Sequence, residues 1–73
     1  MSSMINIKYK LLLKELRKEN GWTQKEVAEK LCTSQQNYQR YETGQIEPDI
    51  KTLIMLSIIF EVSLNELICF KQQ

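Results

Sequence analysis

The chain has 73 residues and a formal net charge of +1, and 42% of its residues are hydrophobic. This composition is typical of one small globular domain, whose core is thin because a short chain can bury little of its surface. Histidine is absent, and the two cysteines, Cys32 and Cys69, lie far apart in the sequence. The commonest general base and a common metal ligand are thus missing, and two cysteines alone make a poor zinc site. We therefore expect neither an enzyme nor a bound metal or cofactor.

The sequence also argues against membrane insertion and secretion. The longest apolar-rich stretch, Leu53 to Phe60, is far shorter than the roughly 20 residues needed to cross a bilayer. Lys8 and Lys10 interrupt the N-terminal segment, which lacks the apolar run of a signal peptide. We therefore expect a cytoplasmic protein that binds no membrane and keeps its cysteines reduced rather than joined in a disulfide.

Charge is unevenly distributed along the chain. The first 25 residues contain six basic and two acidic side chains, whereas the remaining residues contain four basic and seven acidic ones. A nearly neutral protein can therefore present one basic face to an anionic partner such as nucleic acid. The same lysines could equally solvate the outside of a helix, and charge alone does not decide between these alternatives.

Caps and apolar spacing predict three helices in the first part of the chain. Apolar residues at helical intervals predict a helix from about Ile7 to Glu19. Thr23 and Glu26 form a capping box that opens a second helix, and Ser34 can cap a third. Only two or three residues separate the second helix from the third, and so short a link fixes their angle as a helix-turn-helix requires.

Two further helices are predicted in the second part of the chain. Asp49 can cap a helix at 50–60, and a capping box of Ser63 and Glu66 opens a last helix at about 64–70. No segment shows the strict alternation of a β-strand. The sequence therefore predicts an all-α domain of five short helices.

The segment from Thr23 to Pro48, TQKEVAEKLCTSQQNYQRYETGQIEP, resembles the helix-turn-helix core of the Cro/phage-repressor family, also called the XRE family. The match extends to KELRKENGWTQ at 14–24 and to PDIKTLIMLSIIFEVSLNELI at 48–68. The spacing has physical reasons: Ala28, for example, lies where the third helix would cross the second, and a larger side chain would push the two helices apart.

This resemblance implies a lambda-repressor-like domain in which the second and third helices form the helix-turn-helix. It covers about residues 7–68 of a single domain at 1–73, and we expect residues 1–6 and 71–73 to be flexible ends. It also implies a bacterial or phage-encoded, nucleoid-associated regulator of transcription, a repressor, that reads the major groove of double-stranded DNA with the helix at about 35–42. The alternative is an antitoxin that neutralises a partner protein and also binds its own promoter.

The third predicted helix has an apolar face and a polar face. Tyr38 and Tyr41 are three residues apart and must pack inward. Glutamine can pair with adenine, and arginine with guanine, in the major groove, although polar residues on a short helix can also be merely solvated. Members of the family read bases with the outward face, which here carries Gln35, Gln36, Gln39 and Arg40.

The resemblance assigns two further sets of residues. The glutamine that opens the second helix in the family binds a phosphate and braces the third helix, and Gln24 matches it. Arg17 and Glu42 match a structural ion pair that is partly buried between the first helix and the end of the third. The candidates for contacts to DNA phosphates are Gln24, Lys25, Thr43 and the backbone amide of Gln45.

Two residues depart from the family pattern. Cys32 occupies a turn position where glycine is most common and where φ is usually positive. Such a conformation costs a residue other than glycine about 1–2 kcal/mol. Trp22 stands where an aliphatic residue is usual, and we expect it to cover the edge of the core without a functional role.

We expect a symmetric homodimer on a palindromic operator, because one such domain reads few base pairs whereas a two-fold pair reads two half-sites about 34 Å apart. The inward stripe of the fourth helix would consist of Ile50, Leu53, Ile54, Leu56 and Ile59 or Phe60. Apolar residues beyond those that the core requires often mark an interface, unless a thin core uses them too. The candidate dimer interface consists of Met55, Ile58, Ile68 and Phe70.

Overall fold

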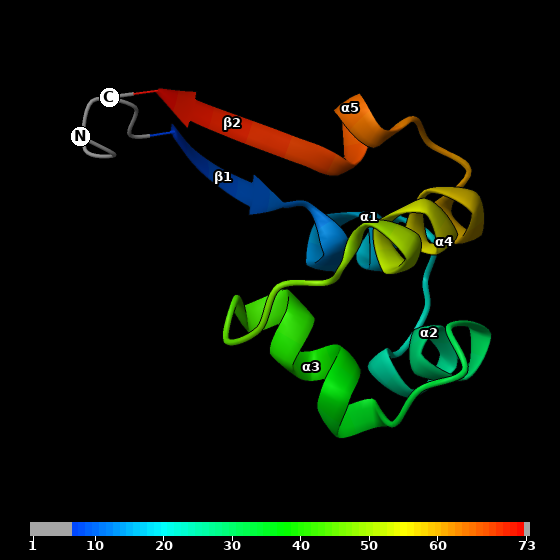
Figure 1. Cartoon of the computed structure of the whole chain (residues 1–73). Helices are drawn as coiled ribbons and strands as arrows, with labels where there is room; N and C mark the ends of the chain where they lie inside the picture. The colour runs from blue at the N-terminus through cyan, green and yellow to red at the C-terminus, as the bar shows by residue number, and fades with distance from the viewer. Residues whose placement is uncertain (1–6, 73) are drawn as a thin grey trace.

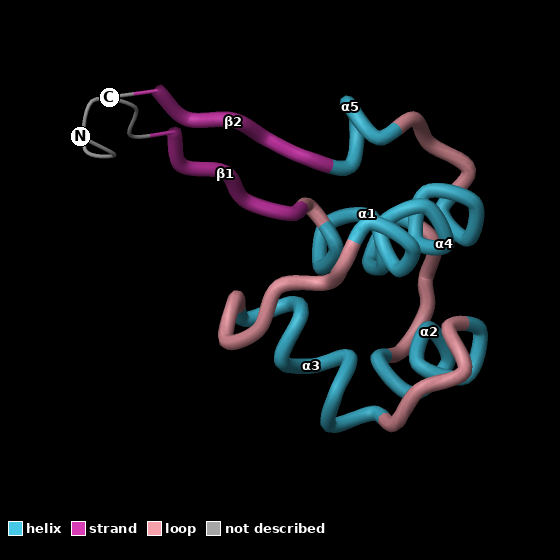
Figure 2. Tube along the Cα trace, in the orientation of Figure 1, coloured by secondary structure: helices cyan, strands magenta, loops and turns pink. Residues whose placement is uncertain are grey.

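The computed structural model describes residues 7–72 of the chain. Its elements are, in chain order, β1 (Ile7–Leu11), α1 (Leu13–Glu19), α2 (Gln24–Lys30), α3 (Gln35–Thr43), α4 (Ile50–Phe60), α5 (Leu64–Leu67) and β2 (Ile68–Gln72). The helices gather into one body, and β1 and β2 form a ribbon that extends from it (Figure 1). Loops connect the helices to one another, as Figure 2 shows. The predicted five-helix fold, with α2 and α3 as the helix-turn-helix, is confirmed.

The structure differs from the sequence prediction at both ends of the domain. The first helix, predicted from about residue 7, begins at Leu13, and the last, predicted to reach about residue 70, ends at Leu67. The flanking segments form the antiparallel pair of β1 and β2, in which Tyr9 lies opposite Phe70. The backbone amide of Leu12 also donates to the carbonyl of Leu67 at 3.0 Å. This pairing joins the two ends of the described chain, so no local sequence pattern could reveal it.

The pairing also fixes part of the segment that we expected to be flexible. Lys71 and Gln72 lie in β2, opposite Lys8 and Ile7 respectively. Residues 1–6 and residue 73, the other ends for which flexibility was expected, lie outside the described residues.

Side chains cap the predicted helix starts. At each of four N-caps the side-chain oxygen accepts a hydrogen bond from a backbone N–H of the first turn, which satisfies a donor that the helix itself leaves unpaired. Both predicted capping boxes are present, with Glu26 and Glu66 bonding back to the N-cap backbone. The four capping residues are Thr23, Ser34, Asp49 and Ser63.

The core lies between the helix-turn-helix and the other helices. Tyr38 of α3 is fully buried, as expected from its spacing, and Ala28 of α2 is 1% exposed, which lets the two helices approach closely. The partly buried Trp22 packs on Phe60 with ring centroids 5.8 Å apart, and the Lys30 ammonium lies 4.6 Å from the Trp22 ring. The buried apolar residues are Leu13, Val27, Ala28, Leu31, Tyr38, Leu56, Phe60 and Leu67.

Part of the predicted inward stripe of α4 is wrong. Leu56 and Phe60 are buried as expected, and Leu53 and Ile59 are partly buried against the core. Ile50 and Ile54, which were also predicted to face inward, are instead exposed. The orientation of α4 depends on how it packs against other elements such as α5, which periodicity within α4 does not specify.

Residues 7–72 contain neither a membrane-spanning helix nor a cluster of metal-binding side chains. No helix in this range is long and apolar enough to cross a membrane. No group of three or more histidine, cysteine, aspartate or glutamate residues is placed so that it could hold a metal ion. Cys32 is an exposed free thiol, whereas the side chain of Cys69 lies outside what the structure describes.

The turn between α2 and α3 contains a strained residue. Cys32 has a φ of 60°, as predicted, and its amide donates to the carbonyl of Glu29 at 3.1 Å. Glu61, which follows α4, has a φ of 56° that the sequence did not reveal. Residues other than glycine rarely adopt this region, because the side chain approaches the following carbonyl.

We predict that Cys32→Gly raises the free energy of unfolding by about 1 kcal/mol, because glycine adopts the left-handed conformation without this steric cost. Urea unfolding under reducing conditions measures the change. Glu61→Gly should act in the same direction. Gly44→Ala should act in the opposite one, since Gly44 has a φ of 83°. A lower unfolding midpoint for Cys32→Gly would show that the thiol makes a contact that outweighs the backbone strain.

Candidate nucleic-acid interface

The turn from α2 to α3 is held by backbone hydrogen bonds. The amide of Leu31 donates to the carbonyl of Val27 at 2.9 Å, and the amide of Thr33 donates to that of Ala28 at 2.9 Å. Ser34 then caps α3 through the amide of Asn37 at 3.1 Å. These bonds leave little freedom between the two helices, so α3 projects from the domain at a fixed angle (Figure 1).

The outward side of α3, from Gln35 to Arg40, presents a polar face with no structural task. The four candidate base-reading residues are exposed, and their side chains form no hydrogen bond or ion pair with any other residue of the described chain. Tyr38 lies on the opposite side of the helix and is fully buried. The structure therefore brings together on one open face Gln35, Gln36, Gln39 and Arg40.

The C-terminal end of α3 is tied to α1 and α2 by a small polar network. Arg17 of α1 donates to both carboxylate oxygens of Glu42, from Nε at 2.6 Å and from Nη2 at 3.2 Å. Its Nη1 donates to the carbonyl of Trp22 at 3.1 Å. Gln24 of α2 donates from Nε2 to Oε1 of Glu42 at 3.0 Å. The side chains of Arg17 and Glu42 are only 12% and 4% exposed, so the bidentate pair is shielded from water and strong.

This network shifts the ionisation of its members. Burial by itself raises the pKa of Glu42, but the hydrogen bonds from Arg17 and Gln24 and the positive charge of Arg17 outweigh it, and the pKa lies below the ordinary glutamate value. Burial raises the pKa of the Tyr38 phenol, and the neighbouring carboxylate of Glu42 raises it further. Near neutral pH the site therefore contains a carboxylate, a guanidinium and a neutral phenol.

The candidate phosphate-contacting residues divide into two groups. Gln24 is partly buried, and its amide is oriented by Glu42. Lys25, Thr43 and Gln45 are exposed. The Thr43 hydroxyl donates to the carbonyl of Arg40 at 3.2 Å and accepts from the amide of Gln45 at 3.4 Å. The Gln45 amide, expected to be free for a phosphate, therefore has a long hydrogen bond within the chain.

Asn37 is a positioning residue to which the sequence analysis assigned no role. Its Nδ2 donates to the Thr33 hydroxyl at 2.9 Å and to the Tyr41 hydroxyl at 3.2 Å. The asparagine thus connects the turn before α3 with the second turn of that helix. The spacing of four residues between these three polar side chains is the signal that could have revealed the contact.

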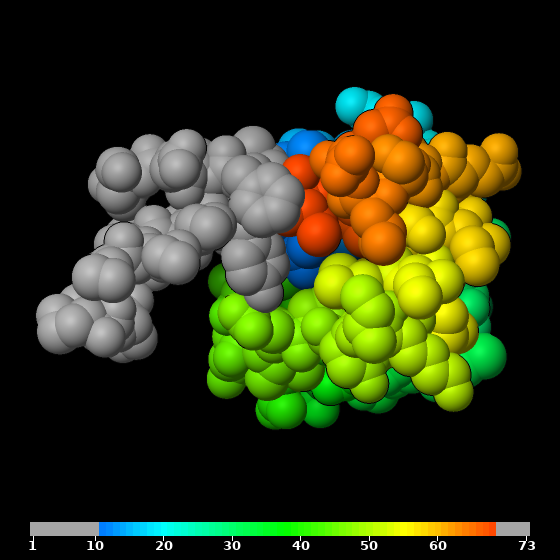
Figure 3. Space-filling model, turned by 45° about the horizontal axis from the view of Figure 1, so that its top comes forward, coloured from blue at the N-terminus to red at the C-terminus, as the bar shows by residue number. Residues whose placement is uncertain are grey.

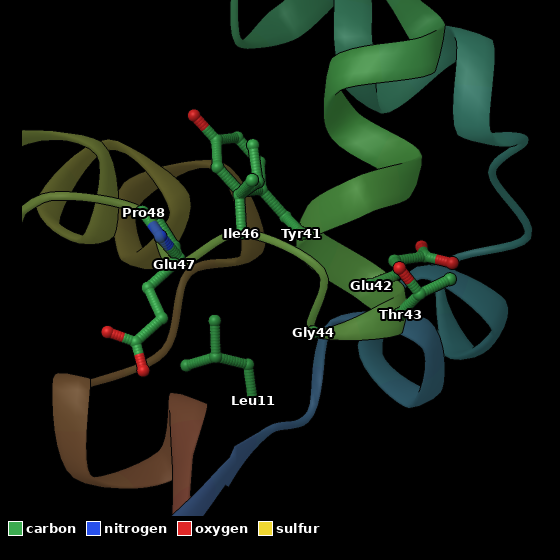
Figure 4. Close-up of a pocket in the computed structure, with 8 residues that line it drawn as sticks. All are labelled: Leu11, Tyr41, Glu42, Thr43, Gly44, Ile46, Glu47 and Pro48. Carbon is green, nitrogen blue, oxygen red and sulfur yellow. The ribbon is translucent and has the colours of Figure 1, made fainter.

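A hollow of about 320 Å³ lies at the C-terminal end of α3, between β1 and the loop that leads to α4 (Figure 4). Leu11, Ile46 and Pro48 contribute apolar surface to it. Its charged lining groups are the carboxylates of Glu42 and Glu47. Because both are acidic, the hollow does not suit a phosphate.

A rigid two-helix unit that presents the open polar face of its second helix defines a helix-turn-helix domain. Residues 13–67 match the helix-turn-helix family HTH_3, and the chain belongs to this family. The resemblance to the phage-repressor type is thereby confirmed.

Three relatives from Bacillus subtilis are named as HTH-type transcriptional regulators. The chain is 46% identical to the uncharacterized HTH-type transcriptional regulator YqaE over 56 residues. This matched segment makes up 77% of this chain and 48% of YqaE. It is 45% identical to the HTH-type transcriptional regulator ImmR, again over 77% of this chain and 44% of the relative. It is 43% identical to the SPbeta prophage-derived regulator YonR, over 77% of this chain and 52% of the relative. The chain thus spans about half the length of these curated relatives.

We predict that Glu42→Gln lowers the free energy of unfolding by about 3 kcal/mol at pH 7, because it leaves the guanidinium of Arg17 shielded without its partner charge. Since the pKa of Glu42 is lowered on folding, its contribution is present above about pH 4.5 and is lost as the pH falls through the folded-state value. The difference between wild type and variant should therefore shrink towards pH 3. Denaturant unfolding at pH 7 and pH 3 measures it.

The free energy of unfolding of the Glu42→Gln variant should still decrease at acidic pH, because other carboxylates contribute to stability. Hydrogen bonds from Thr52 lower the pKa of the exposed Asp49, and those from Ser63 lower the pKa of the exposed Glu66. A Glu42→Gln variant with the same stability loss at both pH values would contradict an ionised, stabilising Glu42.

Proposed function

We propose that the protein is a sequence-specific regulator of transcription, a repressor, that binds double-stranded DNA with α3 in the major groove. The carrying observation is the uncommitted face of α3, whose glutamines and arginine are exposed and have no partner in the described chain. Glutamine and arginine are the side chains that pair in bidentate fashion with adenine and guanine. The names of the related regulators support the same function.

Contacts to the DNA backbone would set the position of α3 in the groove. Gln24 is suited to this task because Glu42 fixes its amide next to the start of α2. Lys25 supplies a positive charge beside it, and Thr43, the last residue of α3, and Gln45, two residues further on, are both exposed. Contacts to phosphates position a protein on the duplex, whereas contacts to base edges supply specificity.

The regulator would act on a palindromic operator as a homodimer, because a single domain of this size reads few base pairs. Such a regulator would work in the cytoplasm at the nucleoid, and we expect it to need no cofactor. The predicted interface residues are not equivalent in the structure: Ile58 is exposed, whereas Met55 and Ile68 pack partly against the core of their own domain. The side chain of Phe70 lies outside the described residues.

Selection of bound duplexes from a random DNA library tests the function directly. We expect the purified protein to enrich one sequence motif, arranged as an inverted repeat with half-site centres about one helical turn apart. Enrichment should weaken at high salt, because the protein displaces counterions from phosphates. Failure to enrich any sequence at low salt would refute the proposal.

We predict that Gln36→Ala and Arg40→Ala each weaken binding to the selected site by about 1–3 kcal/mol while sparing binding to random duplex, because they remove contacts to base edges. Gln24→Ala should weaken both kinds of DNA more evenly. Titration of labelled duplexes at fixed salt measures both affinities, and Asn65→Ala, an exposed change on α5, is the control. Equal losses on selected and random DNA would remove Gln36 from the base-reading set.

A further inference from the structure

The hollow at the C-terminal end of α3 has the size of a site for a small molecule. Its volume of about 320 Å³ has room for about ten water-sized groups, and ligand pockets in proteins begin at roughly 300 Å³. β1 forms one wall of the hollow through Leu11, and the loop after α3 forms another through Ile46 and Glu47 (Figure 4). In Figure 3 the molecule is turned so that its top comes forward, and the green surface of α3 and the loop after it lies at the lower left. Because these walls lie far apart in the sequence, only the folded domain assembles the hollow.

The lining of the hollow combines apolar surface with negative charge. Leu11, Ile46 and the ring of Tyr41 are partly buried, and Pro48 is buried. In Figure 4 the carboxylate of Glu47 projects from the loop towards the side of the hollow that Leu11 forms. None of the lining residues in the described chain is basic. Such a lining suits a ligand that has an apolar body and a positively charged head.

The two acidic residues of the lining differ in what they can offer a ligand. Both carboxylate oxygens of Glu42 already accept hydrogen bonds, from Arg17 and from Gln24. Glu47 is exposed, and it forms no hydrogen bond or ion pair with any residue of the described chain. A positive charge in the hollow would therefore pair with Glu47, whereas an anion would be repelled.

The loop that walls the hollow is weakly held. The backbone amides of Gly44, Gln45 and Ile46 each donate a hydrogen bond of 3.4 Å, which is longer than a normal N–H···O bond. By comparison, the amides of Leu31 and Thr33 in the turn before α3 donate over 2.9 Å. A ligand that contacts the loop after α3 can therefore alter its geometry at little energetic cost.

We propose that the hollow binds a small organic cation, a primary amine with an apolar or aromatic body, and that the bound amine strengthens binding to DNA. The ammonium group pairs with Glu47, and the body of the ligand packs between Leu11 and Ile46. The second part of this proposal rests on the proposed function.

The position of the hollow connects the ligand to the contacts with DNA. Thr43 lines the hollow, and Gln45 lies in the loop that walls it. Both are candidates for contacts to phosphates. A bound amine restricts this loop before DNA arrives, which reduces the ordering cost of binding, and it brings a positive charge near the phosphates. Both effects favour the complex, and coupling between two sites of this kind is typically about 5-fold to 150-fold.

The first experiment tests the site without DNA. The isotope-labelled protein is titrated at pH 7 with phenethylamine, and amide chemical shifts are followed by NMR. We expect saturable shifts, largest from Gly44 to Glu47, with a dissociation constant of about 1 mM. Phenethyl alcohol and phenylacetate have bodies of the same kind without the positive charge, and both should bind at least about 10-fold more weakly.

A pair of matched variants assigns the charge that binds the amine. Glu47→Gln should weaken phenethylamine binding at least about 5-fold, whereas Glu29→Gln, which removes an exposed carboxylate of α2, should bind as the wild type does. The absence of saturable shifts, equal binding of the alcohol, or wild-type affinity in Glu47→Gln would overturn the site.

The second experiment tests the effect on DNA binding. The selected duplex is titrated with and without saturating phenethylamine, and potassium chloride replaces the amine salt so that ionic strength is equal. We expect the amine to tighten binding at least about 5-fold for the wild type and to leave binding by Glu47→Gln unchanged. An unchanged or weaker affinity for the wild type would overturn the regulatory part of the proposal. Glu47-dependent amine binding by a protein that enriches no DNA sequence would leave the site standing while refuting the proposed function.

Discussion

The bidentate ion pair between Arg17 and Glu42 is the contact on which the arrangement of the helices depends. It joins α1 to the C-terminal end of α3, and Gln24 adds a bond from α2 to the same carboxylate. Only 12% and 4% of the two side chains are exposed. Loss of one partner therefore leaves a shielded charge without compensation, which lowers the free energy of unfolding by about 3–5 kcal/mol. In a domain whose core is thin, three helices are thus oriented by one polar contact together with the packing of Tyr38.

The position of this pair separates structure from recognition along α3. The C-terminal end of the helix is committed to Arg17, and its inward side is committed to the core through Tyr38. Asn37 fixes the start of the helix to the preceding turn. The exposed polar side chains from Gln35 to Arg40 are therefore carried on a helix that is held at both ends. In the proposed complex with DNA, such support would reduce the conformational entropy lost on binding.

Apolar surface in α4 exceeds what one copy of the domain can bury. Leu56 and Phe60 complete the core, and the row of Ile50, Ile54 and Ile58 stays outside it. Strained turns at Cys32 and Glu61 reduce stability as well. A small domain with these costs has little stability in reserve.

The sequence by itself determined the starts of α2, α3, α4 and α5, the helix-turn-helix and the polar face of α3, because caps such as Thr23 with Glu26 and the spacing of Tyr38 act within one or two turns of the chain. It also indicated the left-handed conformation of Cys32, because this residue matches a position in the family's turn where φ is usually positive. Only the tertiary structure decided the ribbon of β1 and β2 and the orientation of α4. Strand pairing depends on a partner at the far end of the chain. The few polar residues of α4, Lys51, Thr52 and Ser57, do not form a polar face broad enough to show which side meets the core. For that reason the exposure of Ile50 and Ile54 could not be predicted from periodicity, and it became visible only when the neighbouring helices were in place.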